Sequence, residues 1–248
     1  MAVLWGLDMR DLRWSVFSTA NMWKNTDYHM RRTRFIVYQC ATILLAVSQG
    51  IGTVAMIHYG DQQDFMEKQS PPSYVHNNNF IAVAAFNLGV GIFVSNVFGM
   101  AFFLDLVWPE RKESPAVKLG WRICSGLSCV LTLACAIAYT YIVAAKSAYV
   151  TGTDAATAQR QLALYGGDPL RYRDNWRAVA SVVTLWVGMV PTFAGTYLLW
   201  HSIAHIEAYG PKSKHARIRD GVEAPVVEKQ EGSHDRDEDA KMQPTSVV

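Results

Sequence analysis

The sequence lacks most of the features by which secreted proteins are recognised. Its four cysteines all fall within long apolar segments, so we expect no disulfide in an exposed loop. No Asn-x-Ser/Thr glycosylation acceptor occurs anywhere in the chain. The first 34 residues show no short basic head followed by an apolar core and a small-residue cleavage site, which argues against a removable signal peptide. Targeting is therefore expected to depend on the first apolar segment.

Recognisable nucleotide-binding and catalytic motifs are also missing. The glycines of the segments GIG and GVGIF lie within apolar runs and lack the Lys-Ser/Thr pair of a phosphate-binding loop. Neither a Gly-x-Ser-x-Gly nucleophile elbow nor a Cys-His pair with suitable spacing is present. The net charge of +2 is too small to indicate nucleic acid as a partner. The sequence thus identifies no enzyme class and gives no support for nucleic acid binding.

Charged residues are nearly absent from four long windows and are crowded between them. The windows cover residues 35–59, 80–108, 120–145 and 177–200. A helix needs about 20 apolar residues to cross a hydrocarbon core about 30 Å thick, and each window is long enough. A helix at the surface of a soluble domain would carry charges along its exposed face. The sequence therefore predicts an all-α, multi-pass membrane protein with a four-helix transmembrane bundle, in either the plasma membrane or an endomembrane.

The distribution of Lys and Arg predicts that both termini lie in the cytosol. Arg31, Arg32 and Arg34 crowd the entrance to the first span, and a basic turn at 109–118 follows the second. The connecting loops on the opposite side carry fewer basic residues, and clustered Lys and Arg next to a span mark the cytosolic side.

Two polar segments flank the membrane domain, which we place at residues 35–207. Residues 1–34 mix Trp, Leu and Phe with charges, which indicates a cytosolic arm that is either an interfacial amphipathic helix or disordered with aromatic anchors. Residues 208–248 are polar and nearly free of aromatics, and we expect a disordered cytosolic tail that is available to protein partners. Four basic residues at the start of the tail suit the anionic lipids of the inner leaflet: Lys212, Lys214, Arg217 and Arg219.

The larger outer loop carries the signals of a short helix. Asp154 precedes the segment 155–165 as a capping residue, and Gly166 and Gly167 follow it as a stop. In the fourth span, Pro191 predicts a helix kink.

A few polar side chains lie at membrane depth and must find protein partners there. Gln49, Asn87, Asn96 and Asp105 are the candidates. Asn87 and Asn96 are nine residues apart and so face opposite sides of one helix, which predicts contacts with two different neighbours. Gln49 and Asn87 lie at similar depth and within reach of an interhelical hydrogen bond. These amides either join helices or line a polar pathway, as in a small solute carrier.

The inner ends of the spans hold two further candidate groups. Arg122 lies one turn into the third span and either extends outward to the membrane surface or meets Asp105 of the second span. We favour an ion pair with Asp105 that joins the two spans. His201 and His205 share a helical face, and with Glu207 they form a candidate metal set. This pattern resembles one element of membrane di-iron hydroxylases, although those enzymes carry several histidine boxes. An interfacial histidine pair without a metal is the favoured interpretation.

The order of spans and loops resembles the layout of MARVEL-like and claudin-like proteins across residues 35–207. The claudin-type Gly-Leu-Trp motif with paired cysteines is absent from the first outer loop, and the Cys-Cys-Gly of tetraspanins is absent from the second. The sequence favours a scaffold or organiser that acts through helix, lipid or partner association. The alternatives are a metal-dependent oxidase or hydroxylase that uses His201 and His205, and a small solute carrier. No cofactor is strongly implied.

Overall fold

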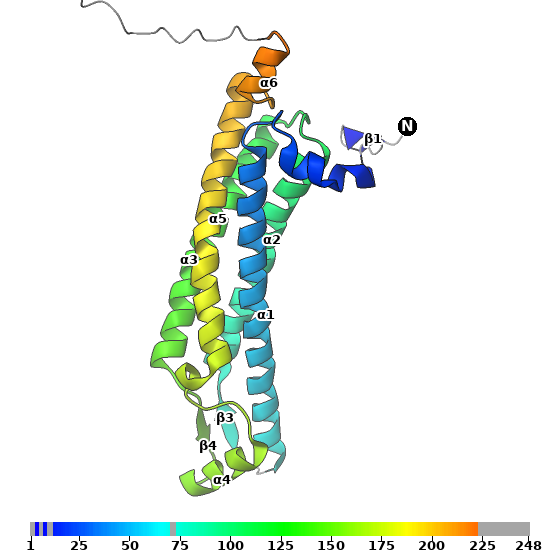
Figure 1. The fold of residues 1–248 in the computed structure, drawn as a ribbon. Coiled ribbons are helices and arrows are strands. Elements are labelled where there is room, and N and C mark those ends of the chain that lie inside the picture. Colours follow the sequence, from blue (N-terminus) through cyan, green and yellow to red (C-terminus); the bar gives the residue numbers. More distant parts are fainter. Residues whose placement is uncertain (1–2, 5–6, 9–11, 70–72, 223–248) are drawn as a thin grey trace, which may run out of the picture.

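Four long helices dominate the computed structural model, which describes residues 3–4, 7–8, 12–69 and 73–222. They stand side by side with alternating direction (Figure 1). Within the described ranges, they are the helices long and apolar enough to cross a membrane: α1 (Arg31–Gln69), α2 (Asn78–Val107), α3 (Pro115–Ala145) and α5 (Trp176–Tyr209). Their length and composition indicate a membrane-embedded protein, as predicted.

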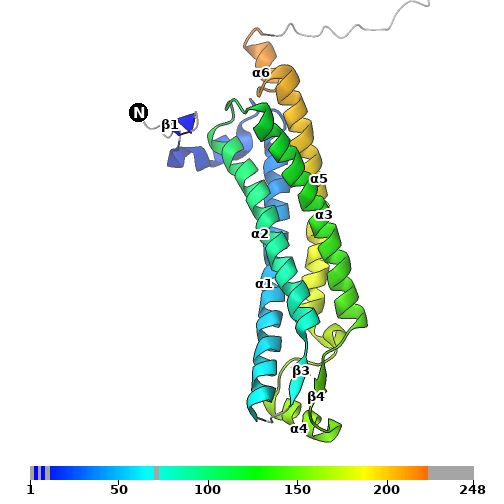
Figure 2. The same cartoon turned by 180° about the vertical axis from the view of Figure 1, so that it is seen from behind.

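The helices form a closed ring in which each packs against its two neighbours. α1 contacts α2 and α5, and α3 contacts the same two helices. Figure 2 shows α2 and α3 on the side of the bundle opposite to that seen in Figure 1. Helix α1 begins and α5 ends at one end of the bundle, which we call the terminal end. The other end, which carries residues 73–77 and the connection 146–175, is called the loop end.

Helix α1 continues to Gln69, well beyond the predicted end of its span at Tyr59. The additional turns pack against the second connecting loop. Tyr59 Oη donates a hydrogen bond to the carbonyl of Pro169 at 2.8 Å, and Gln62 Nε2 donates to the carbonyl of Asp168 at 3.1 Å. The apolar content of the sequence predicts only where a helix leaves the lipid. The contacts with the second connecting loop stabilise further helical turns beyond that point.

In the part of the chain that the structure describes, two short antiparallel sheets supplement the predicted all-α fold. At the loop end, β3 (Tyr74–His76) pairs with β4 (Tyr149–Thr151), with Val75 opposite Val150. This pairing joins the two connecting loops. The second sheet pairs β1 (Val3–Leu4) with β2 (Leu7–Asp8) in the N-terminal arm.

Helix α4 (Ala155–Tyr165) confirms the helix predicted in the second loop. The side chain of Asp154 accepts a hydrogen bond from the backbone N–H of Thr157, which satisfies one of the free donors at the helix start. Gly166 ends the helix with φ at 64°, a left-handed conformation that glycine adopts without a steric penalty.

The polar segments at the terminal end are more ordered than the sequence predicts. The N-terminal arm extends sideways from the bundle as two short turns, Trp14–Phe17 and Ala20–Lys24, and not as one long amphipathic helix (Figure 1). The beginning of the predicted disordered tail folds into α6 (Lys214–Arg219). Residues 223–248 of that tail lie outside the described residues.

Candidate functional site

Buried hydroxyl and amide groups tie three helices together at mid-depth. The hydroxyl of Ser48 donates to the carbonyl of Ser181, and the hydroxyl of Ser181 donates to the carbonyl of Ser48, both at 2.8 Å. Asn87 Nδ2 donates to Ser48 Oγ at 3.3 Å. α1, α2 and α5 are therefore joined through polar groups that satisfy one another. Sequence reasoning identified Asn87 but missed both serines, because serine is common in spans and only its partner gives it this role.

The close approach of α1 to its neighbours at this level depends on Gly52. A Cβ atom on Gly52 would lie 2.8 Å from Ser181 Oγ and 3.1 Å from Tyr139 Oη. A larger residue would therefore separate the helices, as expected at interfaces built from small residues.

The other two amides do not join this group. No hydrogen bond links Gln49 to Asn87; Gln49 Oε1 is buried without a partner in the described part of the chain and lies against Gly91. Asn96 is exposed, and its amide donates to the carbonyl of Ile92 in its own helix at 2.8 Å. The predicted second neighbouring helix for Asn96 is therefore wrong, since the preceding turn of α2 already provides an acceptor.

Asp105 lies at the terminal end between two arginines. Its carboxylate accepts from Arg34 Nη1 at 2.6 Å and from Arg111 Nη1 at 3.0 Å, and the side chains of Asp105 and Arg34 are only 9% and 7% exposed. Arg111 also binds Glu113 at 2.6 Å. A charged group with so little solvent is tolerated only when it is paired, so these residues form a tightly coupled buried network.

The predicted ion pair between Asp105 and Arg122 is wrong. Arg122 Nη2 donates instead to Glu207 of α5 at 2.9 Å, and Lys118 Nζ lies 3.7 Å from the same carboxylate. The ion pair of Arg122 with Glu207 therefore joins α3 to α5, whereas Asp105 pairs with Arg34 of α1. The spacing of charged residues along a two-helix hairpin does not show whether a third helix carries a nearer ion-pair partner.

A cavity of ≈ 300 Å³ adjoins this network at the terminal end. One side is apolar and is formed largely by the last turns of α5. The other side is charged and is formed by the start of α1 and the connection between α2 and α3. The residues that line the cavity include Arg34, Asp105, Glu110, Arg111, Lys112, Glu113, Lys118, Trp121, Leu199, Ser202, Ile203 and Ile206.

Three histidines meet beside the cavity. The ring of His29, from the segment before α1, stacks on His205 with centroids 3.7 Å apart and planes 6° apart. His29 Nε2 also lies 3.4 Å from His201 Nδ1. Burial, together with the positive charge of His205, His201, Arg34 and Arg217, lowers the pKa of His29 to about 4. His29 is therefore neutral at pH 7. The sequence did not predict that His29 joins this cluster, because it lies far from α5 along the chain.

The structure does not bring the predicted metal set together. The carboxylate of Glu207 forms ion pairs with Arg122 and Lys118. The ring of His29, which is not part of the predicted set, stacks against both histidines. Within the described ranges, no group of three or more His, Cys, Asp or Glu is arranged to hold a metal.

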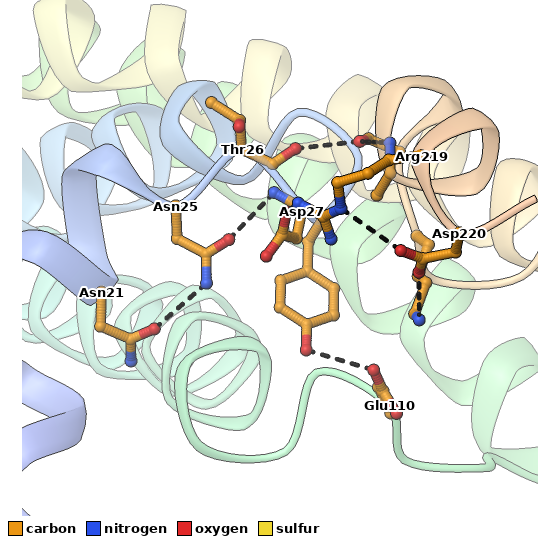
Figure 3. Close-up of polar contacts among 11 residues, drawn as sticks. Asn21, Asn25, Thr26, Asp27, Glu110, Arg219 and Asp220 are labelled. Carbon is orange, nitrogen blue, oxygen red and sulfur yellow. Dashed lines mark hydrogen bonds and ion pairs between the residues drawn. The ribbon is translucent and has the colours of Figure 1, made fainter.

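The segment before α1 and the segment after α5 are held together by what we call the terminal clasp, residues 26–29 against residues 210–220 (Figure 3). Arg219 Nη1 donates to Asp27 Oδ1 at 2.8 Å, and Ser213 Oγ donates to the carbonyl of Thr26 at 2.9 Å. Tyr28 Oη donates to Glu110 at 3.3 Å, which connects the clasp to the turn between α2 and α3.

Some of the basic residues predicted to face anionic lipids take part in the clasp. Lys212 Nζ binds Asp220 at 2.8 Å, and Arg217 donates to the carbonyl of Lys212 at 3.1 Å. Their charges therefore stabilise α6 as well as adding to the positive potential of this end.

No protein-family model, curated protein or solved structure matches the chain. The functional interpretation therefore depends on the geometry of the terminal end and of the bundle.

Proposed function

We propose that the chain is a multi-pass membrane protein, with both termini in the cytosol, that acts by association as a scaffold or organiser of lipids and protein partners. The observation that carries this proposal is that the polar groups at mid-depth form hydrogen bonds between helices. Ser48, Asn87 and Ser181 are bonded to one another across three helices. Such bonding favours a fixed framework over a polar path for a solute.

The charge of the terminal end supports the cytosolic assignment. Arg31, Arg34, Arg111, Lys112 and Lys118 gather there, at the ends of three helices. Basic residues next to spans are retained on the cytosolic side during insertion. The same positive end suits the anionic inner leaflet.

The two alternative functions gain no specific support. A carrier pathway through Gln49, Asn87 and Asn96 would need these amides to share one space, but Asn96 is exposed and bonded to its own helix. A metal-dependent hydroxylase would need convergent ligands, but His201 and His205 stack with His29 instead.

Extraction of the full chain from its membrane in polymer nanodiscs tests the proposal, because the polymer keeps neighbouring lipids and proteins in place. We expect particles that contain further protein copies or reproducible neighbours, with anionic lipids enriched over the bulk membrane. Single chains surrounded by lipid of bulk composition would contradict association. A solute flux above that of empty liposomes would favour the carrier instead.

A further inference from the structure

The cavity at the terminal end has two walls of opposite character. Leu199, Ile203 and Ile206 of α5 line one wall, while Arg34 and Arg111 line the other. A purely polar solute would leave the first wall uncovered, and a purely apolar one would leave the second unsatisfied. An amphiphile with a polar headgroup matches both walls.

Three polar atoms at the cavity have no hydrogen-bond partner in the described part of the chain. They are Ser202 Oγ, Trp121 Nε1 and Arg34 Nε, and Ser202 is only 2% exposed. The tryptophan and arginine nitrogens can act only as donors, and the serine hydroxyl can donate as well. A buried donor without an acceptor is unfavourable, so a ligand rich in acceptor oxygens would bind favourably here.

The charges around the cavity favour a negative ligand. Its cationic lining side chains outnumber the anionic ones by four to three. Two of the acids, Asp105 and Glu113, are already bound by arginines. Lys112 has no ion-pair or hydrogen-bond partner within the described residues, and Lys118 has only the 3.7 Å contact with Glu207. The unneutralised positive charge thus lies next to the unpartnered donors.

We propose that this cavity binds the phosphate-bearing headgroup of an anionic membrane lipid, with the first part of its acyl chain against Leu199, Ile203 and Ile206. Ligand cavities span roughly 300 to 1,000 Å³, so ≈ 300 Å³ accommodates a headgroup and a few methylenes and not a whole lipid. The inference deepens the proposed function and rests on it, because it names the class of lipid with which the membrane-embedded chain would associate.

Binding to the purified full chain in a non-ionic detergent tests the proposal. Fluorescent dioleoyl phosphatidic acid is titrated against the protein and compared with phosphatidylcholine carrying the same acyl chains. We expect the anionic lipid to bind at least about tenfold more tightly, since hydrogen bonds to charged acceptors are the stronger ones. Inorganic phosphate is added as a competitor, and we expect it not to displace the lipid at equal concentration.

Two conservative variants locate the site, each with a matched control. Trp121→Phe and Ser202→Ala each remove one unpartnered donor, and each should weaken binding of phosphatidic acid about tenfold. Trp176→Phe, at the exposed start of α5, and Ser95→Ala, which removes another unpartnered hydroxyl outside the cavity, should leave affinity unchanged. Thermal unfolding of all four variants shows whether each remains folded, and the comparison uses only those that do.

Equal affinity for the two lipids would overturn the proposal that the ligand is anionic. Full displacement by inorganic phosphate would assign the site to a free anion and overturn the lipid assignment. Unchanged affinity in folded Trp121→Phe and Ser202→Ala would overturn the location. None of these results depends on the neighbours found in nanodiscs, so the cavity and the proposed function can fail separately.

Discussion

Replacement of Asp105 by Asn should destabilise the bundle more than any other single loss of charge at the terminal end. The substitution keeps the shape of the side chain but leaves Arg34 buried without its counter-ion. Arg34 Nη1 lies 2.6 Å from the Asp105 carboxylate, and the arginine side chain is only 7% exposed. Removing one partner of such a pair costs about 3–5 kcal/mol. Because Arg111 keeps Glu113 as a partner, we expect the lower part of this range, about 3 kcal/mol.

The free energy of unfolding in bicelles, measured by steric trapping, provides the assay. Glu207→Gln is the matched control, because it also removes a carboxylate bound by basic side chains at the same end of the bundle. The Glu207 side chain is 41% exposed, so its loss should cost less than about 1 kcal/mol. If Asp105→Asn also costs less than about 1 kcal/mol, the assignment of a buried, coupled network is wrong.

The double substitution Arg34→Met with Asp105→Leu tests the same reasoning from the opposite direction. It removes both charges and leaves apolar side chains of similar length. Replacing a whole buried pair in this way is often neutral, whereas breaking it is costly. We therefore expect the double variant to be more stable than Asp105→Asn alone, and the reverse order would contradict this account.

Three further perturbations test other parts of the structure. Gly52→Ala should cost about 1–3 kcal/mol because its new Cβ would lie 2.8 Å from Ser181 Oγ, whereas Gly50→Ala, which has open space, should cost little by the same assay. The pKa of His29 is about 4, below its ordinary 6.5, so its contribution to the clasp should be complete above pH 6.5 and be lost as the pH falls through about 4. Spin-label distances between the arm and α6 would show this opening, and a constant distance across that range would contradict it. Asp154→Ala should destabilise α4 by about 1 kcal/mol, seen as faster amide exchange in that helix alone.

The sequence was sufficient to predict the four long helices, because a membrane-spanning helix is marked by its length and by the absence of charge. The short helix after Asp154 and its stop at Gly166 were predictable for a similar reason, since both signals are local. The extension of α1 past Tyr59 was not, because its turns pack against the second connecting loop: Gln62 donates a hydrogen bond to the carbonyl of Asp168, more than a hundred residues away.

The sequence showed which polar residues lie within the spans, but it did not show which residues they contact. Asp105 was identified as the charged group of the second span, but its partner Arg34 lies in another helix, and the helix order decides the pairing. Asn87 and Asn96 looked equivalent in sequence, although only Asn87 faces another helix. His29 lies beside the histidine pair of α5 because the terminal clasp holds the segment before α1 against the segment after α5.

The proposed topology has four membrane crossings and leaves both chain ends on the cytosolic side. Single cysteines introduced as Val222→Cys and Leu164→Cys, in a chain whose native cysteines are replaced by alanine, test it because these positions are 76% and 82% exposed at opposite ends. In sealed vesicles with the cytosolic face outward, an impermeant maleimide should label position 222 at once and position 164 only after detergent is added. Labelling of both positions before detergent, of neither, or of position 164 alone would contradict the account.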